Sequence, residues 1–344
     1  MRIGLLGAGR IGAFHAATLA AHPEVGGLLV ADADPARARR LAAAHGGTAC
    51  PVEALWAGRP DAVVIASATA AHAGQIAAAA RAGVPVFCEK PVAVDLPGTL
   101  AALRAVDRAG GVLQVGFQRR FDPGYLAARA ALRAGRVGRL HTVRTVSSDG
   151  QPPPEAYVPL SGGLYRDCLI HDFDVLRWVT GREITEVYAT GANVGADYFR
   201  AAGDVDTATA LLTLEGGVLA TATAARYHAA GYDVRMELAG TEDQLTVGGG
   251  PRAPLTSVEP GAPGGRPDGW TGFLERFGSA YRAEIDAFVR VARGEAANPC
   301  DGRDALRALL VAEACEVSRR ERRPVRVAEM ESAVRPGERI GVVT

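Results

Sequence analysis

The sequence predicts two domains of different class: a doubly wound parallel α/β domain at the N-terminus, then an α+β domain with a large, mostly antiparallel sheet. The length of 344 residues exceeds the roughly 250–300 residues that one hydrophobic core usually fills. The first third alternates short apolar runs with Ala-rich stretches at βαβ spacing. Beyond residue 120, apolar runs follow one another with short turns, which favours antiparallel pairing.

The apolar runs of the first third predict a parallel sheet that is covered on both faces, because they are apolar throughout. The predicted strands are 3–6, 27–31, 62–66, 84–88 and 112–115. The predicted helices between them are 13–21, 35–44, 72–82 and 97–109. We place the first domain at residues 1–120.

The second domain is predicted at residues 121–344, and its closing helices could pack back on the first domain. It should begin with a helix at 123–134, a strand at 139–146 and a helix at 165–180. The further predicted strands are 184–194, 205–214, 218–227, 232–239 and 243–247. Residues 248–269 are rich in Gly and Pro and predict a surface loop. The chain then closes with helices at 273–293 and 302–320 and a short run at 324–327.

The composition excludes several classes of protein. Lys plus Arg equals Asp plus Glu at 38 each, so no electrostatic reason favours nucleic acid or an anionic membrane as a partner. No apolar stretch approaches the roughly 20 residues of a membrane span. Residues 3–6 already belong to a strand, so we expect no signal segment. The five cysteines are odd in number and widely spaced, which predicts neither a disulfide framework nor structural zinc and favours a reducing cytoplasm.

The first apolar run leads directly into Gly7-Ala8-Gly9-Arg10-Ile11-Gly12. Between a strand and a helix, this G-x-G-x-x-G pattern is typical of a dinucleotide-binding turn. Gly7 would permit the tight turn, Gly9 would let the main chain approach a pyrophosphate, and Gly12 would let helix and strand pack closely. We therefore predict that the cofactor is bound by Gly7, Gly9, Arg10, Ile11 and Gly12. An ordinary Gly-rich loop is the alternative, because the chain has 42 glycines.

Asp32 ends the second predicted strand. A carboxylate there can accept hydrogen bonds from the adenosine ribose hydroxyls and would repel a 2′-phosphate. The residues that follow it at once are Ala33, Asp34 and Pro35, with no Arg or Lys among them. Both features favour NAD over NADP. A surface turn aspartate is the alternative.

Polar residues follow the third and fourth predicted strands, at the edge of the sheet where ligands bind in open α/β folds. After the fourth strand come Glu89 and Lys90, which we place beside the cofactor. A lysine there could hydrogen-bond a reacting hydroxyl and stabilise negative charge on its oxygen, although a solvated loop lysine is the alternative. Ser67, Thr69 and His72 follow the third strand as candidates to cradle the cofactor, and Thr69 could instead cap the next helix.

Asp167 and His171 are spaced i and i+4 in the predicted helix at 165–180, so one face carries both. An imidazole with a carboxylate one turn away is a good proton acceptor for an alcohol. Such pairs also occur on ordinary surfaces, and Asp172 and Asp174 could cap the helix. A metal held by His171 with Asp167, Cys168 or Asp172 is disfavoured, because no second ligand cluster lies nearby, and we predict no metal.

Together these motifs resemble the Gfo/Idh/MocA-type nicotinamide oxidoreductases, over nearly the whole chain. The resemblance rests on residues 7–12, Asp32, 89–91, 116–122, 162–163, Asp167 and His171. Within that family, residues 114–125 and 161–178 look most like inositol 2-dehydrogenases. The resemblance implies that Lys90, Asp167 and His171 are the catalytic set.

The resemblance also implies a mechanism. NAD would bind along the carboxyl edge of the first sheet, with a polyol between that sheet and the antiparallel one. His171 would take the hydroxyl proton while hydride leaves the same carbon, Lys90 would polarise the oxygen, and Asp167 would orient the histidine or a substrate hydroxyl. With myo-inositol the product would be 2-keto-myo-inositol. A related sugar or polyol dehydrogenase, a ketone reductase and a regulator without catalysis are the alternatives.

Other hydroxyls of the substrate would be bound by further polar residues. The expected substrate-binding set is Lys90, Arg119, Asp149, Asp167, His171 and Tyr281. Arg119 could instead pack or form a salt bridge, and Tyr281 could be a ring at the edge of the core. The family further implies a homo-oligomer, often a tetramer, built through the exposed face of the second sheet.

Overall fold

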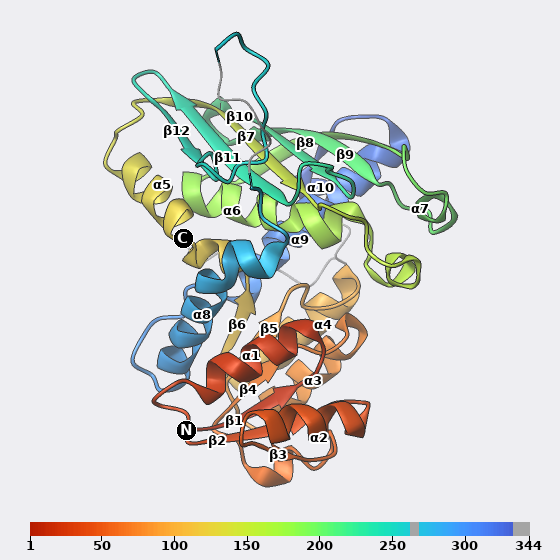
Figure 1. Cartoon of the computed structure of the whole chain (residues 1–344), viewed down its shortest axis with the longest axis vertical. Coiled ribbons are helices and arrows are strands. Elements are labelled where there is room, and N and C mark those ends of the chain that lie inside the picture. The colour runs from red at the N-terminus through yellow and green to blue at the C-terminus, as the bar shows by residue number, and fades with distance from the viewer. Residues whose placement is uncertain (262–267, 333–344) are drawn as a thin grey trace. The chain divides into compact units, whose positions relative to one another are not determined.

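The computed structural model describes residues 1–261 and 268–332, so part of the predicted 248–269 loop and the last residues of the second domain lie outside the described residues. The chain forms two compact units (Figure 1). The first unit comprises Met1–Phe121 and Gly278–Leu306; the second comprises Asp122–Phe277 and the residues from Arg307 onward. Part of the predicted 121–344 segment therefore belongs to the first unit.

The first unit is built on a sheet of six parallel strands in the order β3-β2-β1-β4-β5-β6. Its strands are β1 (Arg2–Leu6), β2 (Gly27–Ala31), β3 (Thr48–Ala49), β4 (Ala62–Ile65), β5 (Val86–Glu89) and β6 (Leu113–Gly116). The doubly wound parallel sheet is confirmed, and β3 is an addition that the sequence analysis missed. The strand order reverses between β1 and β4, and ligands bind at the carboxyl end of such a reversal.

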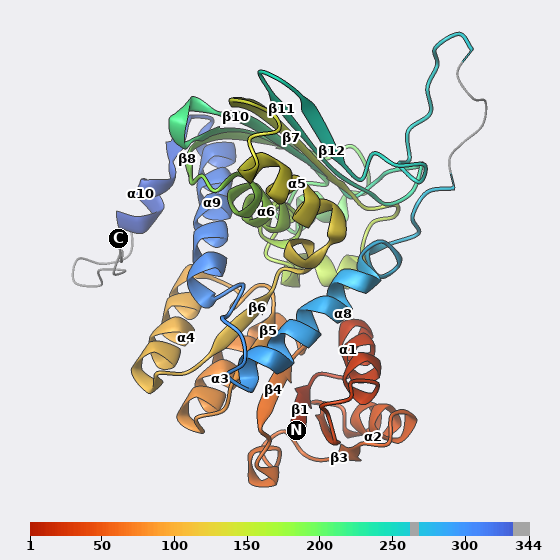
Figure 2. The ribbon, with the colours of Figure 1, turned by 90° about the vertical axis from the view of Figure 1, so that its left-hand side faces the viewer.

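Helices cover both faces of this sheet, with α1 and α2 on one face and α3 and α4 on the other (Figure 2). Their bounds are α1 (Arg10–Ala20), α2 (Pro35–Ala44), α3 (Thr69–Arg81) and α4 (Leu96–Ala109). Two of them begin at a capping aspartate followed by proline in the first turn. Asp34 accepts the main-chain N–H groups of the first turn of α2, and Asp95 does the same for α4.

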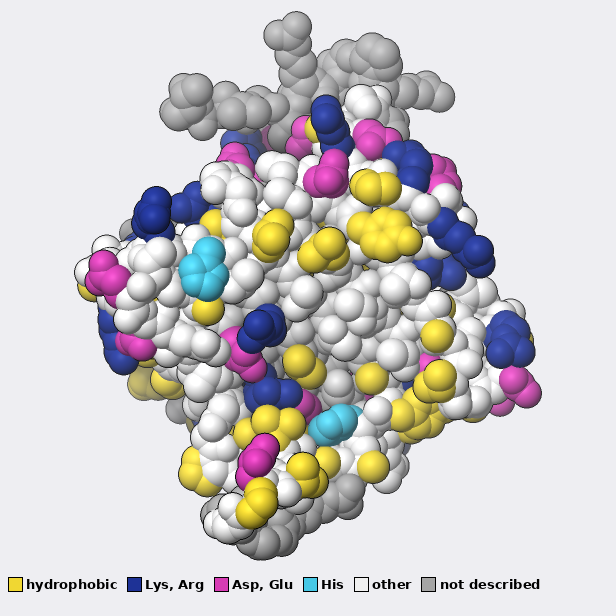
Figure 3. Space-filling view, turned by 90° about the horizontal axis from the view of Figure 1, so that it is seen from above, with side chains coloured by type: hydrophobic (Ala, Val, Ile, Leu, Met, Phe, Trp, Pro, Cys, Tyr) yellow, Lys and Arg dark blue, Asp and Glu magenta, His cyan; other side chains and the backbone are white. Residues whose placement is uncertain are grey.

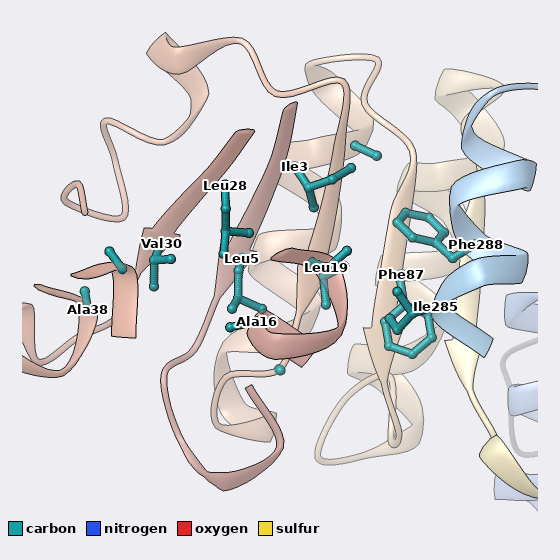
Figure 4. Close-up of a cluster of buried hydrophobic side chains, with 14 residues drawn as sticks. Ile3, Leu5, Ala16, Leu19, Leu28, Val30, Ala38, Phe87, Ile285 and Phe288 are labelled. Carbon is teal, nitrogen blue, oxygen red and sulfur yellow. The ribbon is translucent and has the colours of Figure 1, made fainter. Parts of the chain in front are cut away.

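The core of the first unit includes residues that are far apart in the sequence (Figure 4). Side chains of β1, β2 and β5 meet side chains of α1, α2 and helix α8 (Phe273–Ala292) in one buried apolar cluster. The ring of Phe87 on β5 lies 5.8 Å, centroid to centroid, from the ring of Phe288 on α8. Each such buried aromatic side chain contributes about 1.5–3 kcal/mol. This packing makes the greater part of α8 an integral element of the first unit.

The second unit is built on a sheet of seven strands in the order β12-β11-β7-β10-β9-β8-β13. Its strands are β7 (Leu140–Ser148), β8 (Ile184–Ala192), β9 (Thr207–Leu214), β10 (Leu219–Ala225), β11 (Asp233–Gly240), β12 (Gln244–Val247) and β13 (Val325–Arg326). All neighbouring strands are antiparallel except β7 and β10, which are parallel. The predicted mostly antiparallel sheet is confirmed.

The helices of the second unit include α5 and α6, which lie against one face of the sheet (Figure 2). The bounds are α5 (Pro123–Arg133), α6 (Ile170–Thr180), α7 (Tyr198–Ala201), α9 (Gly302–Glu321, from Arg307 onward) and α10 (Val327–Ser332). The prediction of one α-helix over 165–180 is wrong in its first turn, because Tyr165–Leu169 forms a π-helical turn. In neither unit is a described helix long and apolar enough to cross a membrane.

Candidate active site

The turn between β1 and α1 has the geometry that a pyrophosphate requires. Gly7 has φ +105°, and a Cβ on Gly12 would lie 2.1 Å from the Gly7 carbonyl oxygen, so both positions require glycine. A Cβ on Gly9 would meet no atom within 4 Å, which leaves open space above the turn. No side chain caps the N-terminus of α1. Its first N–H groups can therefore serve an anion, and the turn fits a dinucleotide cofactor.

Asp32 connects this turn to the end of β2. One carboxylate oxygen accepts the Ala8 N–H at 2.6 Å, and the other accepts the Asp34 N–H at 2.8 Å. Each oxygen keeps a second lone pair, so the carboxylate can also accept ribose hydroxyls. Asp34, not Asp32, caps the following helix.

The predicted residues after β4 and β5 lie at one edge of the sheet, because these parallel strands are neighbours. The Ser67 hydroxyl donates to the Gln75 side chain at 2.8 Å. His72 is buried, and its two ring nitrogens lie 2.8 Å from the Pro91 carbonyl oxygen and 3.1 Å from that of Ser67. His72 therefore links the segments that follow the two strands. Thr69 is the first residue of α3 and does not cap it, because Ala68 is the N-cap.

Glu89 and Lys90 stand at the end of β5 with different surroundings. The Glu89 side chain is buried and lies 2.7 Å from Nε2 of His15. Lys90 is the next residue and is half-buried. Glu89 is the last residue of β5, whose residues are all buried, and Lys90 lies just beyond the strand.

In the second unit, the π-helical turn presents Asp167 to a buried arginine. Nη2 of Arg226, the residue after β10, donates to Asp167 at 2.7 Å, and the Tyr157 hydroxyl donates to the other carboxylate oxygen at 3.0 Å. Asp149, which follows β7, accepts from Arg226 at 3.2 Å. The sequence-predicted residues Asp149 and Asp167 thus share one cation. His171 lies in the first turn of α6, directly after the π-helical turn.

The charge of Arg226 is strongly favoured. Burial alone would lower the pKa of its guanidinium, but the neighbouring Cys168, Asp167 and Asp149 outweigh burial and raise that pKa. The Tyr157 hydroxyl keeps its proton, because burial and then the adjacent Asp167 raise its pKa. Both donors therefore hold the Asp167 carboxylate in one orientation.

The alternative that Asp172 and Asp174 cap this helix is not realised. Leu169 is the N-cap of α6, so neither Asp172 nor Asp174 caps that helix. Asp172 is fully buried and accepts the Ser147 hydroxyl at 2.7 Å. Within residues 1–261 and 268–332, the cluster of His, Cys, Asp and Glu side chains close enough for a metal does not include His171.

Arg119 and Tyr281 belong to the first unit, whereas Asp167 belongs to the second. Arg119 is buried in a short helical turn after β6. Tyr281 is buried on α8, where its ring meets the edges of Phe14 and His15 at centroid distances of 5.7 and 6.1 Å. Their role in binding substrate stays a prediction.

Arg226 and Tyr157 are site residues that the sequence did not predict. Arg226 follows a strand whose buried and exposed residues alternate, and a charged residue directly after such a strand is a weak signal. Tyr157 lies in a 3₁₀-helical segment, Glu155–Leu160, beyond the Pro152–Pro154 run. Neither residue has a spacing that ties it to Asp167.

The parallel sheet and the glycine turn define a NAD-binding oxidoreductase, and comparison with known proteins agrees. Residues 1–117 match the family model of oxidoreductases with a NAD-binding Rossmann fold. Residues 125–246 match the model of the GFO/IDH/MocA C-terminal domain. The chain belongs to the Gfo/Idh/MocA oxidoreductase family.

Similar proteins include several inositol dehydrogenases. A myo-inositol dehydrogenase of Streptomyces leeuwenhoekii is 42% identical, over 91% of this chain and 96% of that one. An inositol 2-dehydrogenase of Rhizobium meliloti is 38% identical, over 95% of this chain and 99% of that one. The structure of a scyllo-inositol dehydrogenase from Lactobacillus casei with NAD(H) and scyllo-inositol is 30% identical, with a TM-score of 0.84, over 95% of this chain and 99% of that one.

Proposed function

We propose that this protein oxidises a secondary hydroxyl of an inositol to a ketone, with NAD as the hydride acceptor. Myo-inositol, which would give 2-keto-myo-inositol, is the first candidate. The inositol dehydrogenases among its relatives support this choice. The observation that carries it is the Asp167 carboxylate, held by two donors on the turn directly before His171.

The roles of the residues follow from their chemistry. His171 would act as the general base and take the hydroxyl proton of the substrate, a role that typically contributes 10²–10⁴-fold to the rate. Asp167 would orient His171 or a neighbouring hydroxyl, and its own position is fixed by Arg226 and Tyr157. The Lys90 ammonium would stabilise negative charge on the reacting oxygen.

The proposed reaction balances. The O–H proton of the alcohol passes to His171, and the C–H bond of the same carbon breaks with both of its electrons. Bound NAD supplies the acceptor for that hydride. Asp32 would hold the adenosine ribose, and the glycine turn with the N-terminus of α1 would hold the pyrophosphate.

The test is NADH formation by the purified protein with myo-inositol, scyllo-inositol and glucose, with NAD and NADP in parallel. We expect turnover of an inositol with NAD and at least tenfold less with NADP, because the Asp32 carboxylate would repel a 2′-phosphate. Turnover confined to sugars would overturn the inositol assignment. The absence of turnover with any polyol, despite NAD binding, would overturn the oxidative function.

Scyllo-inositol is the second candidate substrate. It differs from myo-inositol in the orientation of one hydroxyl, and the solved structure of a similar protein contains it. A site that hydrogen-bonds each hydroxyl discriminates strongly between such isomers. The ratio of kcat/KM for the two inositols decides between the candidates.

We also propose that the protein assembles into a homo-oligomer through the outer face of its second sheet, and that it works in the cytoplasm, where its five free cysteines stay reduced. Tyr188, Leu211 and Leu219 of adjacent strands β8, β9 and β10 are 44–50% exposed. Figure 3 shows hydrophobic side chains on a largely uncharged surface at this face. Such a patch is typical of an interface.

A further inference from the structure

Three buried titratable side chains that the proposed reaction does not use meet inside the first unit. They are His15 on α1, Glu89 at the end of β5 and Glu284 on α8. Nε2 of His15 lies 2.7 Å from a Glu89 carboxylate oxygen, and one side-chain atom of each residue lies within 4.8 Å of the other two. His15 and Glu284 are fully buried. We call this group the His15–Glu89–Glu284 cluster.

Glu284 is the residue whose charge needs explanation. Neither of its carboxyl oxygens has a hydrogen-bond partner among the described residues. An ionised carboxylate that is buried without a donor, close to a second carboxylate, is strongly unfavourable. Burial, and then the charge of Glu89, raise the pKa of Glu284 well above its usual value. Burial without a donor therefore favours the neutral carboxylic acid form of Glu284, which has a proton to donate.

The geometry favours a shared proton over a metal ion. Two ligands of one tetrahedral zinc ion, each about 2.0–2.1 Å from the metal, lie about 3.3 Å apart. The distance of 2.7 Å between His15 and Glu89 is shorter and is that of a direct hydrogen bond. Nδ1 of His15 has no partner among the described residues, so a second proton on this ring would be a buried, unsatisfied donor. His15 therefore donates its Nε2 proton to Glu89.

Two aromatic rings and an amide lie next to the cluster. The ring of Phe87 lies 5.4 Å from that of His15, and Tyr281 covers the imidazole from another side. The Gln114 amide donates to the main-chain oxygen of Glu284 at 3.0 Å. Glu89, whose charge acts on Glu284 in addition to burial, lies 2.7 Å from Nε2 of His15 on α1.

We propose that Glu284 is a positioning residue for Lys90: as a neutral acid it directs its proton to Glu89, and together with His15 it fixes the end of β5 against α1. This inference rests on the proposed function. Lys90 directly follows Glu89, and α1 directly follows the glycine turn. The cluster thus ties the lysine that acts on the substrate oxygen to the helix that receives the cofactor's pyrophosphate.

Two substitutions of Glu284 distinguish the effect of its proton from the effect of its side-chain volume. Glu284→Gln keeps a donor of the same shape, and Glu284→Met keeps the volume without a donor. We expect kcat of Glu284→Gln to stay within threefold of the wild type, and kcat of Glu284→Met to fall at least tenfold with KM for the polyol changed less than threefold. Asp286→Asn is the matched control, because Asp286 is an exposed residue of the same helix. Equal kcat values for the Gln and Met variants, each per folded protein, would overturn the proposal.

An infrared spectrum tests the proton directly and needs no turnover, so it stands even if no inositol is a substrate. The wild type should show the carbonyl stretch of a buried protonated carboxyl, shifted in D₂O, and Glu284→Gln should lack it. An unchanged band in Glu284→Gln would contradict the proposal. So would a rise in melting temperature when zinc is added to the wild type but not to Glu284→Gln, because it would assign the cluster to a metal.

Discussion

At the scale of single residues, two buried polar groups, one in each unit, differ in how they hold charge. Arg226 in the second unit is balanced by Asp149 and Asp167 and stays cationic. Glu284 in the first unit has no cationic partner in its cluster and stays neutral. The first arrangement fixes an anionic group beside the predicted base, and the second supplies a proton donor. Desolvation sets both outcomes, because a charge is kept in the interior where it is paired or hydrogen-bonded.

The protonation of Glu284 predicts a pH dependence of stability. The folded chain keeps a proton that the unfolded chain loses above about pH 4.3, so the free energy of unfolding falls as the pH rises from that value toward the raised pKa. The free energy of unfolding of Glu284→Gln should not fall in this way, because glutamine does not titrate. Above about pH 4.3 and below the raised pKa of Glu284, the unfolding free energy of the variant should rise relative to that of the wild type by up to about 1.4 kcal/mol per pH unit. Urea unfolding of both proteins at several pH values measures this difference. Parallel plots of unfolding free energy against pH would contradict a neutral Glu284.

At the scale of elements, the turn between β1 and α1 separates the roles of its glycines. A Cβ on Gly12 would strike a main-chain oxygen that cannot move aside, whereas a Cβ on Gly9 would point into open space. We expect Gly12→Ala to lower the free energy of unfolding by about 1–3 kcal/mol. Gly9→Ala should keep the stability of the wild type but bind NAD at least tenfold more weakly, because its methyl group occupies the path of the pyrophosphate.

Thermal unfolding and calorimetric titration with NAD check both glycine variants. Each variant is the control of the other, since one tests packing and the other tests ligand approach. Wild-type NAD affinity in Gly9→Ala would show that the pyrophosphate does not approach this turn.

The sequence predicts elements well where the signals are local. Asp34-Pro35 and Asp122-Pro123 begin helices at those residues, because the aspartate caps and the proline fits the first turn. β3 escapes prediction because it has only two residues, and the π-helical turn at Tyr165–Leu169 escapes because it needs one extra residue per turn and has no composition of its own.

In the candidate site, too, residues with a local sequence signal were predicted and residues without one were not. Asp32, Lys90 and the Asp167–His171 pair were accessible from the sequence, since each follows a strand or shares a helical spacing. Arg226 and Glu284 were not, because their neighbours in the site lie 58 residues and more away along the chain and only the fold brings them together. Long-range polar contacts leave no periodic trace in a sequence.

At the scale of the whole molecule, the exposed apolar side chains on the outer face of the second sheet indicate that the protein forms a homo-oligomer through this face. Leu211→Glu places a charge at the centre of the proposed interface, where burial of an unpaired carboxylate is unfavourable. We expect the native mass, measured by light scattering, to fall from that of an oligomer to that of a smaller species. Val258→Glu is the control, because Val258 is 93% exposed outside the strands. An unchanged mass in Leu211→Glu, or a monomeric wild type, would contradict this interface.

The central claim is that His171 takes the proton from an inositol hydroxyl while NAD takes the hydride. The most direct measurement compares NADH formation from myo-inositol by the wild type and His171→Ala, with NAD affinity determined on the same samples. The account predicts that kcat of the variant falls by about 10²–10⁴-fold while its Kd for NAD stays within twofold of the wild type. Full activity of His171→Ala, or a loss explained by NAD affinity alone, would contradict it.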